Sequence, residues 1–254
     1  MLLSLQDVRK TFGGLAAVDG ASLSVGSGEV HGLIGPNGAG KTTLLNMISG
    51  LIPPTAGTIV LDGERIDGMP SHVVASRGIT RTYQNIRLFP ALTAADNVLV
   101  GAHLRRDAPL WRRMLFLPSA AVEERAAQDA SLALLARVGM SGQAGERASN
   151  LSYGDQRRVE IARALASEPR VMLLDEPTAG MNPAEVVAIA ELIRSVARTG
   201  HSVLLVEHNV KLVMDVCDRI TVLDFGKVIA DGTPTEVARD PAVIAAYLGG
   251  EAAA

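Results

Sequence analysis

A glycine-rich run at residues 32–43, GLIGPNGAGKTT, has the residue types and spacing to hold a nucleoside triphosphate. It fits the phosphate-loop pattern G-x-x-x-x-G-K-[ST]. Glycines let the backbone approach phosphate oxygens closely, and consecutive N–H groups form an anion-binding nest. Lys41 offers a charge to the β- and γ-phosphates, and the Thr42 hydroxyl suits Mg²⁺, which prefers oxygen ligands. The loop residues expected to contact the nucleotide are Gly35, Pro36, Asn37, Gly38, Ala39, Gly40, Lys41, Thr42 and Thr43.

Two acidic residues and a histidine follow apolar runs further along the chain. Asp175 and Glu176 come directly after the uninterrupted apolar run 171–174, and His208 follows a similar run at 202–206. Such runs are typical of parallel strands buried on both faces, whose carboxyl ends meet at one edge of a sheet. There Asp175 suits a second Mg²⁺ anchor, and Glu176 could accept a proton from water attacking the γ-phosphate. His208 lies at the same predicted edge of the sheet, from which it could reach the γ-phosphate. We expect the other histidines to be structural: His31, His72, His103 and His201.

The elements that must position these residues alternate between strand and helix. Residues 29–34 read as a strand entering the glycine loop, and residues 41–48 read as a helix leaving it. A helical block from about 93 to 139 interrupts the alternation. This pattern predicts an α/β fold with a parallel-sheet core and an inserted helical subdomain. Phe12 lies in a glycine turn, where it could stack on a purine or belong to the core.

Composition narrows the classes of protein to consider. The chain has 254 residues, 48% of them hydrophobic, and carries a formal net charge of −3. It therefore lacks the basic field that a nucleic-acid partner would need, and we expect none. Its one cysteine, Cys217, excludes an internal disulfide framework. No apolar run approaches the length that spans a bilayer.

Taken together, these motifs resemble the ATPase subunit of ABC transporters in order and spacing. The resemblance covers essentially the whole chain and rests on the phosphate loop, Gln84, residues 151–155 (LSYGD), residues 173–176 (LLDE) and His208. It implies the P-loop ABC ATPase fold: a RecA-like core at about 1–87 and 168–254, with an antiparallel β subdomain and a helical subdomain at about 88–167. It implies ATP and Mg²⁺ as the bound groups.

The resemblance also implies roles for single residues. Phe12 is similar to the aromatic residue that stacks on adenine, and Gln84 to the glutamine that contacts Mg²⁺ or water and couples to the membrane subunit. Ser152 and Gly154 are similar to the signature residues that hold the γ-phosphate of a partner subunit's ATP. Glu176 would be the general base and His208 the switch histidine. Two cassettes must then pair head to tail with ATP between them.

Three positions depart from the family's usual pattern. The signature is usually L-S-G-G-Q, but Tyr153 replaces its first glycine and Asp155 its glutamine. Asn182 stands where the following loop usually carries an aspartate. Because Ser152 and Gly154 match the family's pattern, we still expect a working site. These departures leave its rate of ATP turnover undetermined.

Several short segments resemble those of one subgroup of this family, the LivG-type ATPases of branched-chain amino acid importers. They are residues 11–15 (TFGGL), 85–89 (NIRLF), the insertion 101–123, 150–154 (NLSYG), 207–214 (EHNVKLVM) and 246–249 (AYLG). Such an importer implies two transmembrane permease subunits, a second ABC ATPase as homo- or heterodimer partner, an extracytoplasmic substrate-binding protein, and a place on the cytoplasmic face of the plasma membrane. ATPases of urea or amide importers and of lipopolysaccharide exporters share much of the pattern.

Two further questions stay open at the level of sequence. The basic, apolar-rich part of the insertion, between Arg105 and Phe116, could touch a membrane or a partner, or could pack on its own helices. A soluble ABC ATPase without a transport role is the alternative function. A GTPase is excluded by the lack of an Asn-Lys-x-Asp run for guanine.

Overall fold

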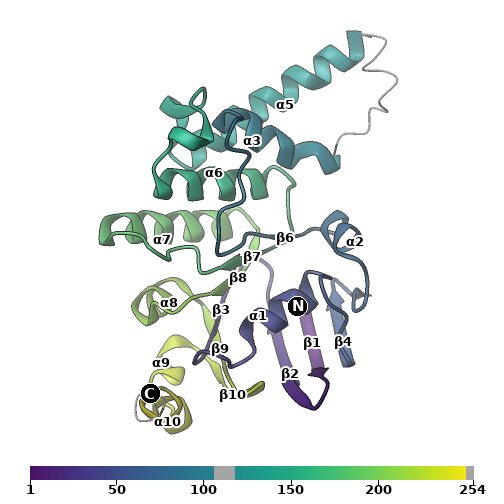
Figure 1. Cartoon of the computed structure of the whole chain (residues 1–254), viewed down its shortest axis with the longest axis vertical. Coiled ribbons are helices and arrows are strands. Elements are labelled where there is room, and N and C mark those ends of the chain that lie inside the picture. The colour runs from purple at the N-terminus through teal and green to yellow at the C-terminus, as the bar shows by residue number, and fades with distance from the viewer. Residues whose placement is uncertain (106–117, 250–254) are drawn as a thin grey trace. The chain divides into compact units, whose positions relative to one another are not determined.

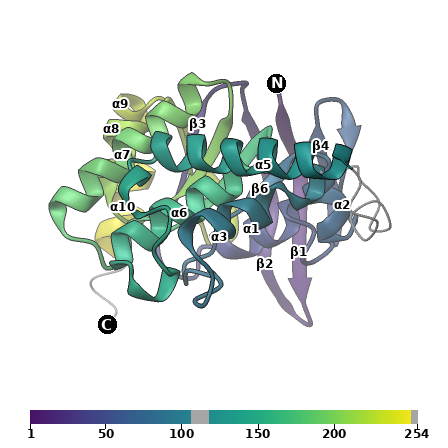
Figure 2. The ribbon, with the colours of Figure 1, turned by 90° about the horizontal axis from the view of Figure 1, so that it is seen from above.

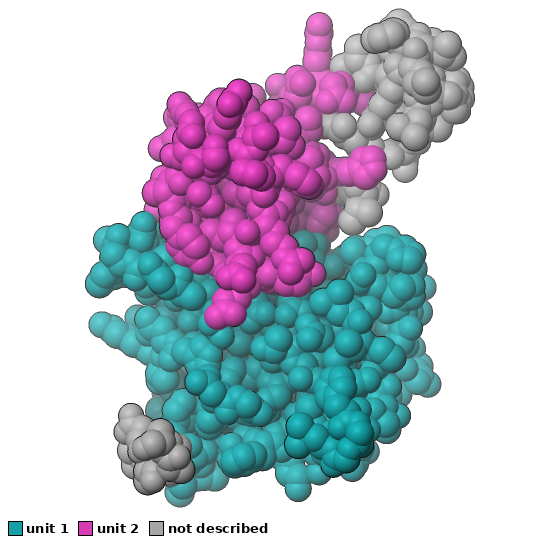
Figure 3. All heavy atoms as spheres, viewed as in Figure 1, with its two compact units in different colours: residues 1–81, 170–254 teal, residues 82–169 magenta. Residues whose placement is uncertain are grey.

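The computed structural model describes residues 1–105 and 118–249, which form two compact units (Figure 3). The first unit comprises residues 1–81 and 170–254, and the second comprises residues 82–169. The first segment of the first unit therefore ends at Arg81. Each unit is described by itself below. No helix in the part of the chain that the structure describes is long and apolar enough to cross a membrane.

A mainly parallel sheet forms the core of the first unit, as predicted (Figure 1). Its strand order is β10-β9-β3-β8-β7-β6. The strands are β3 (Val30–Ile34), β6 (Ile79–Arg81), β7 (Val171–Asp175), β8 (Ser202–Val206), β9 (Arg219–Asp224) and β10 (Lys227–Gly232). All pairs are parallel except β9 with β10. Every residue of β3, β7 and β8 is buried, which confirms the interpretation of 171–174 and 202–206 as buried strands.

A second, antiparallel sheet has the order β2-β1-β4-β5. Its strands are β1 (Leu3–Phe12), β2 (Leu15–Val25), β4 (Ala56–Leu61) and β5 (Glu64–Arg65). Asp62 and Gly63 form the tight turn between β4 and β5, with φ of +49° and +82°. The β1–β2 hairpin is paired as far as Phe12 and Leu15, so its turn consists of Gly13 and Gly14 alone.

The helix α1 (Lys41–Ile48) packs between the two sheets of this unit (Figure 1). Its buried side chains, among them Leu44, Leu45 and Ile48, join one hydrophobic cluster with residues of both sheets. Burial of each such side chain contributes about 1.5–3 kcal/mol. The end of α1 that carries Lys41 is therefore held firmly against β3.

The other helices of the first unit are α2 (Ser71–Ser76), α7 (Pro183–Arg198), α8 (Val210–Val216), α9 (Pro234–Val237) and α10 (Pro241–Gly249). Helices α7 and α8 cover the face of the parallel sheet opposite α1 (Figure 1). Asn182 caps α7 through bonds to the N–H groups of Ala184 and Glu185, with Pro183 in the first turn.

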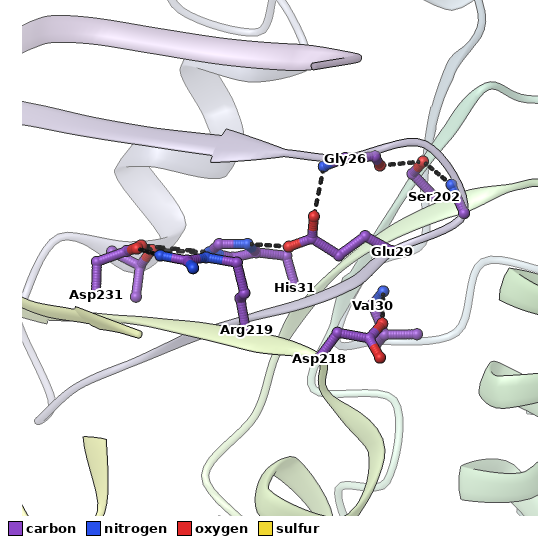
Figure 4. A network of polar contacts seen from close by, with 10 residues as sticks. Gly26, Glu29, Val30, His31, Ser202, Asp218, Arg219 and Asp231 are labelled. Atoms are coloured by element: carbon purple, nitrogen blue, oxygen red, sulfur yellow. Dashed lines mark hydrogen bonds and ion pairs between the residues drawn. The ribbon is translucent and has the colours of Figure 1, made fainter. Parts of the chain in front are cut away.

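A buried polar network ties β3 to β9 and β10 (Figure 4). His31 is fully buried, with Nδ1 2.8 Å from Glu29 Oε1 and Nε2 2.7 Å from Thr221 Oγ1. The Thr221 hydroxyl donates in turn to Asp231, which also pairs with Arg219. These partners satisfy the polar atoms of the imidazole within the sheet, in keeping with the structural role expected of His31.

The second unit is helical. It contains α3 (Ala94–Gly101), η1 (Ala102–Arg105), α5 (Pro118–Arg137), η2 (Ser141–Gln143), η3 (Ala148–Asn150) and α6 (Tyr153–Leu165). Helix α3 packs against both α5 and α6 (Figure 2). Gly101 permits the close approach, since a Cβ there would lie 2.0 Å from the Arg163 carbonyl oxygen. Most of the basic stretch between Arg105 and Phe116 lies outside the described residues.

Candidate nucleotide site

The glycine loop leaves β3 and enters α1 with a backbone that excludes larger residues. A Cβ on Gly35 would lie 2.0 Å from the Leu223 carbonyl oxygen, and one on Gly40 would lie 2.4 Å from that of Ala17. Gly40 also has a left-handed φ of +103° and caps α1 without any side-chain hydrogen bond. The N-terminal N–H groups of α1 are therefore left for a ligand, at the positive end of the helix dipole.

Lys41 folds back over this loop. Its Nζ donates to the carbonyl oxygens of Gly35 and Pro36 at 2.7 and 2.9 Å, and the residue is only 6% exposed. Burial lowers the pKa of Lys41, while the nearby charges of Glu176 and Asp175 act to raise it. A phosphate group would offer this ammonium a stronger acceptor than a carbonyl.

The loop, Glu176 and His208 line one cavity of about 220 Å³. Its lining residues are Ala17, Asn37, Gly38, Ala39, Gly40, Lys41, Thr42, Thr43, Glu176 and His208. The structure thus brings together, within the first unit, residues that the sequence spreads over some 170 positions. Gly35 and Pro36 lie just behind this surface, where they accept from Lys41.

Glu176 and His208 form a pair at the edge of this cavity. His208 Nε2 lies 2.9 Å from Glu176 Oε1. Glu176 has a φ of +47°, a left-handed conformation that is uncommon for any residue except glycine. Its N–H donates to Val206 O at 2.9 Å, which fixes the turn directly after β7. Such backbone strain recurs at functional sites, where the surrounding structure holds it.

Asp175 is buried at the end of β7 and is not among the lining residues. Its Oδ2 accepts from Arg81 Nη2 at 2.8 Å. Only 8% of the Asp175 side chain and 5% of the Arg81 side chain is exposed. Sequence reasoning missed Arg81, because one arginine at the end of a short strand carries no distinguishing signal.

Glu207 is a second residue that sequence reasoning left without a role. It is 5% exposed and accepts from the N–H and hydroxyl of Thr178 at 2.9 and 2.6 Å. Its other oxygen accepts from the N–H of His208 at 3.1 Å. The carboxylate therefore joins the loop after β7 to the loop after β8. Its position after a buried strand, like that of Asp175, was the available signal.

Phe12 stands at the tip of the β1–β2 hairpin and is half exposed. Its ring lies 5.2 Å from Lys10 Nζ. This exposure excludes the core alternative for Phe12, and the Lys10 ammonium lies over its ring as in a cation–π contact.

The remaining candidate residues belong to the helical unit. The Ser152 side chain caps α6, accepting from the Asp155 N–H at 3.2 Å and donating to the Asp155 carboxylate at 2.8 Å. Gly154 is buried in the first turn of α6. The departures Tyr153 and Asp155 are thus both engaged locally, since the Tyr153 hydroxyl accepts from Arg157 at 3.3 Å.

Arg157 links α6 to the segment that carries Gln84. It is fully buried and donates to the carbonyl oxygens of Tyr83 and Gln84, at 2.7 Å in each case. It also pairs with Glu160 at 2.5 Å. Sequence reasoning missed Arg157, because the carbonyls of Tyr83 and Gln84 that it bonds lie more than 70 positions away in the chain.

The donors of the first unit fit a nucleotide bound with Mg²⁺. Backbone N–H groups, the Lys41 ammonium and the hydroxyls of Thr42 and Thr43 suit phosphate oxygens. Among the described residues there is no group of three or more His, Cys, Asp or Glu able to hold a metal ion. Mg²⁺ bound with a nucleotide usually takes most of its ligands from phosphate and water and only one or two from the protein, so this finding is compatible with Mg²⁺ here.

Comparison with known proteins gives concordant matches. Residues 18–179 match the ABC transporter family model, and residues 227–253 match a model described as branched-chain amino acid ATP-binding cassette transporter. The chain is 43% identical to the high-affinity branched-chain amino acid transport ATP-binding protein LivG of Escherichia coli K12, over 98% of both chains. It is 43% identical to BraF of Pseudomonas aeruginosa over the same shares, and 38% identical to the lipopolysaccharide export protein LptB of E. coli over 97% of both.

Solved structures agree with these matches. The crystal structure of an ATP-binding cassette of an ABC transporter in its ADP conformation superposes with a TM-score of 0.85 at 30% identity, covering 98% of both chains. A dimeric cassette bound to ADP and phosphate superposes with a TM-score of 0.77 at 26% identity, covering 92% of this chain and 99% of the other.

Proposed function

Because the chain belongs to the ABC transporter family of ATP-binding proteins, we propose that it hydrolyses ATP to energise an importer of branched-chain amino acids. The observation that carries the ATPase proposal is the single cavity shared by the phosphate loop, Glu176 and His208. The choice of cargo is supported by the 43% identity to LivG and BraF and by the matched C-terminal segment. The lipopolysaccharide-export alternative has weaker support, at 38% identity.

Each residue of the cavity takes a role that its geometry allows. The loop N–H groups and Lys41 bind the β- and γ-phosphates and stabilise the charge that develops on them. Glu176 orients and deprotonates the attacking water, and His208, 2.9 Å away, holds the Glu176 carboxylate in place and reaches toward the γ-phosphate. Mg²⁺, when bound, neutralises phosphate charge; Thr42, Asp175 and Gln84 are its proposed protein contacts. Phe12 stacks on the adenine.

Completion of the site requires a second cassette. Ser152 and Gly154 of one subunit hold the γ-phosphate bound by the other, in a homodimer or with a second ABC ATPase. The dimer works with two permease subunits at the cytoplasmic face of the membrane and, through them, with an extracytoplasmic substrate-binding protein. Closure and reopening of the dimer around ATP drive the permeases. The helical subdomain, about residues 88–167, carries Ser152 and Gly154.

Uptake measurements test the proposed cargo. A strain that lacks this chain is complemented with the native chain or with Glu176→Gln, and uptake of labelled leucine and of labelled urea is compared. We expect the native chain alone to restore leucine uptake and neither to change urea uptake. Restored urea uptake would identify an amide importer. If neither compound responds and no permease co-purifies with ATP-bound Glu176→Gln from solubilised membranes, the transport role is wrong.

A further inference from the structure

Arg81, the last residue of β6, places its guanidinium among three polar side chains of the first unit. Nη2 donates to Asp175 Oδ2 at 2.8 Å. Nη1 donates to Asn46 Oδ1 at 2.6 Å and lies 3.3 Å from Ser49 Oγ. Asn46 lies in α1 and Ser49 caps its C-terminal end, so Arg81 is anchored at the far end of the helix that begins with Lys41.

The ion pair is too buried to be a surface contact. Only 5% of the Arg81 side chain and 8% of the Asp175 side chain is accessible. Burying two charges costs several kcal/mol per ion, and apolar residues of similar volume would often stabilise the fold as well or better. Stabilisation of the fold therefore explains this ion pair poorly. The pair does fix the orientation of the Asp175 carboxylate, because the planar guanidinium bonds its partners at fixed angles.

Arg81 fixes the orientation of the Asp175 carboxylate through one of its two oxygens. Arg81 holds Oδ2 of Asp175. The position of β6 beside β7, with Arg81 in register with Leu173, brings the guanidinium to the end of the strand that carries Asp175. Side-chain rotation of Asp175 is thereby restricted, and the contacts of the described residues leave Oδ1 for another ligand.

We propose that Arg81 is the positioning residue for the metal-binding carboxylate: it anchors Oδ2 of Asp175 to α1 and presents Oδ1 to the divalent cation of the bound nucleotide. The proposal rests on the proposed function, in which Asp175 helps to hold Mg²⁺. It assigns Asn46 and Ser49 the supporting task of fixing the guanidinium. Residues that orient a metal ligand in this way typically change metal affinity or activity 10- to 100-fold when replaced.

The test measures how Mg²⁺ strengthens nucleotide binding by the full-length chain. Affinity for the non-hydrolysable analogue AMP-PNP is determined by calorimetry in EDTA and across a Mg²⁺ titration. The variants are Arg81→Met, which keeps the length of the side chain without its charge, and Arg81→Lys, which keeps the charge without the fork. Arg77→Met is the matched control, because Arg77 pairs only with the exposed Glu64 among the contacts that the described residues show.

We expect Arg81→Met to raise the Mg²⁺ concentration for half-maximal effect about tenfold, with affinity in EDTA within twofold of native. The Mg²⁺ concentration for half-maximal effect should be intermediate in Arg81→Lys and equal to the native value in Arg77→Met. The EPR spectrum of Mn²⁺ bound with the nucleotide should change in Arg81→Met, a signature that a merely structural role would not produce. If Arg81→Met does not fold, Arg81→Lys and Asn46→Ser carry the test, with shifts of the same sign.

The variant Asp175→Asn distinguishes a failure of the positioning role of Arg81 from a failure of the metal-binding role of Asp175. If Asp175→Asn shifts the Mg²⁺ titration but Arg81→Met does not, the positioning role is wrong and the proposed function stands. If Asp175→Asn has no effect either, the assignment of Asp175 to the metal is wrong. If Arg81→Met weakens binding equally in EDTA, Arg81 acts on the loop as a whole and the proposal is overturned.

Discussion

Replacing Arg157 with methionine removes a fully buried cation and the closest ionic partner of Glu160. Glu160 keeps the N–H of Arg87 at 3.2 Å and the more distant guanidinium of Arg163 at 3.8 Å. Breaking a buried ion pair on one side costs about 3–5 kcal/mol, because an uncompensated charge remains inside. The carbonyls of Tyr83 and Gln84 also lose a donor, at about 1 kcal/mol each. Because Arg163 and the Arg87 N–H still offset part of the Glu160 charge, we expect the free energy of unfolding to fall by about 4–6 kcal/mol and the melting temperature to fall by roughly 10–20 °C.

Urea and thermal denaturation followed by circular dichroism measure this loss. Arg158→Met is the matched control, since that neighbouring side chain is 28% exposed and lies 3.9 Å from Asp155. Its loss should stay within about 1 kcal/mol. The double variant Arg157→Met/Glu160→Met should regain most of the stability, because no unpaired charge is left. A loss in Arg157→Met no larger than in Arg158→Met would refute the reasoning.

The pH dependence of the same variant gives an independent check. Burial raises the pKa of Glu160 above its ordinary 4.5, while the charge of Arg157 acts to lower it. A carboxyl whose pKa is raised by folding stabilises the fold fully below pH 4.5 and loses that contribution as pH rises through the folded pKa. Without Arg157 that pKa rises further. The deficit of Arg157→Met should therefore be smaller at pH 5 than at pH 8, and an equal deficit would contradict this account.

Three further outcomes are expected. Gly35→Ala should abolish nucleotide binding in calorimetry, because its Cβ would meet the Leu223 carbonyl oxygen at 2.0 Å; native affinity would contradict the geometry. Burial raises the pKa of the Cys217 thiol to about 12, so iodoacetamide should label it at pH 8 only in urea, and rapid labelling of the folded chain would refute its burial. Glu207→Gln should lower ATP turnover about tenfold at unchanged nucleotide affinity, since it loosens the loop before His208; unchanged turnover would remove that role.

Much of the fold could be predicted because its signals are local. Uninterrupted apolar runs marked β7 and β8, and the glycine loop marked the end of β3 and the start of α1. The length of the β1–β2 hairpin escaped prediction for a physical reason. The far halves of both strands are largely exposed, so the sequence there lacks the apolar alternation that reveals a strand.

In the candidate site, too, residues with a local sequence signal were predicted and residues without one were not. The loop, Glu176 and His208 were predicted as neighbours because strand ends in a parallel sheet share an edge. Arg81, Glu207 and Arg157 were not found, because each bonds a group 29 or more positions away. Arg81 bonds Asp175, Glu207 bonds Thr178, and Arg157 donates to the Tyr83 carbonyl. Side chains that orient other residues carry no pattern of their own along the chain.

The most direct test of the account is the rate of ATP hydrolysis by Glu176→Gln beside its affinity for ATP. Glu191→Gln, an exposed carboxylate on α7, serves as the matched control. We predict that Glu176→Gln loses at least 100-fold in turnover, the lower bound of the roughly 10²–10⁴-fold range for a general base, while it binds ATP as the native chain does. Native turnover in Glu176→Gln would contradict the assignment of the base, and a loss shared by Glu191→Gln would show that the effect is not specific to the site.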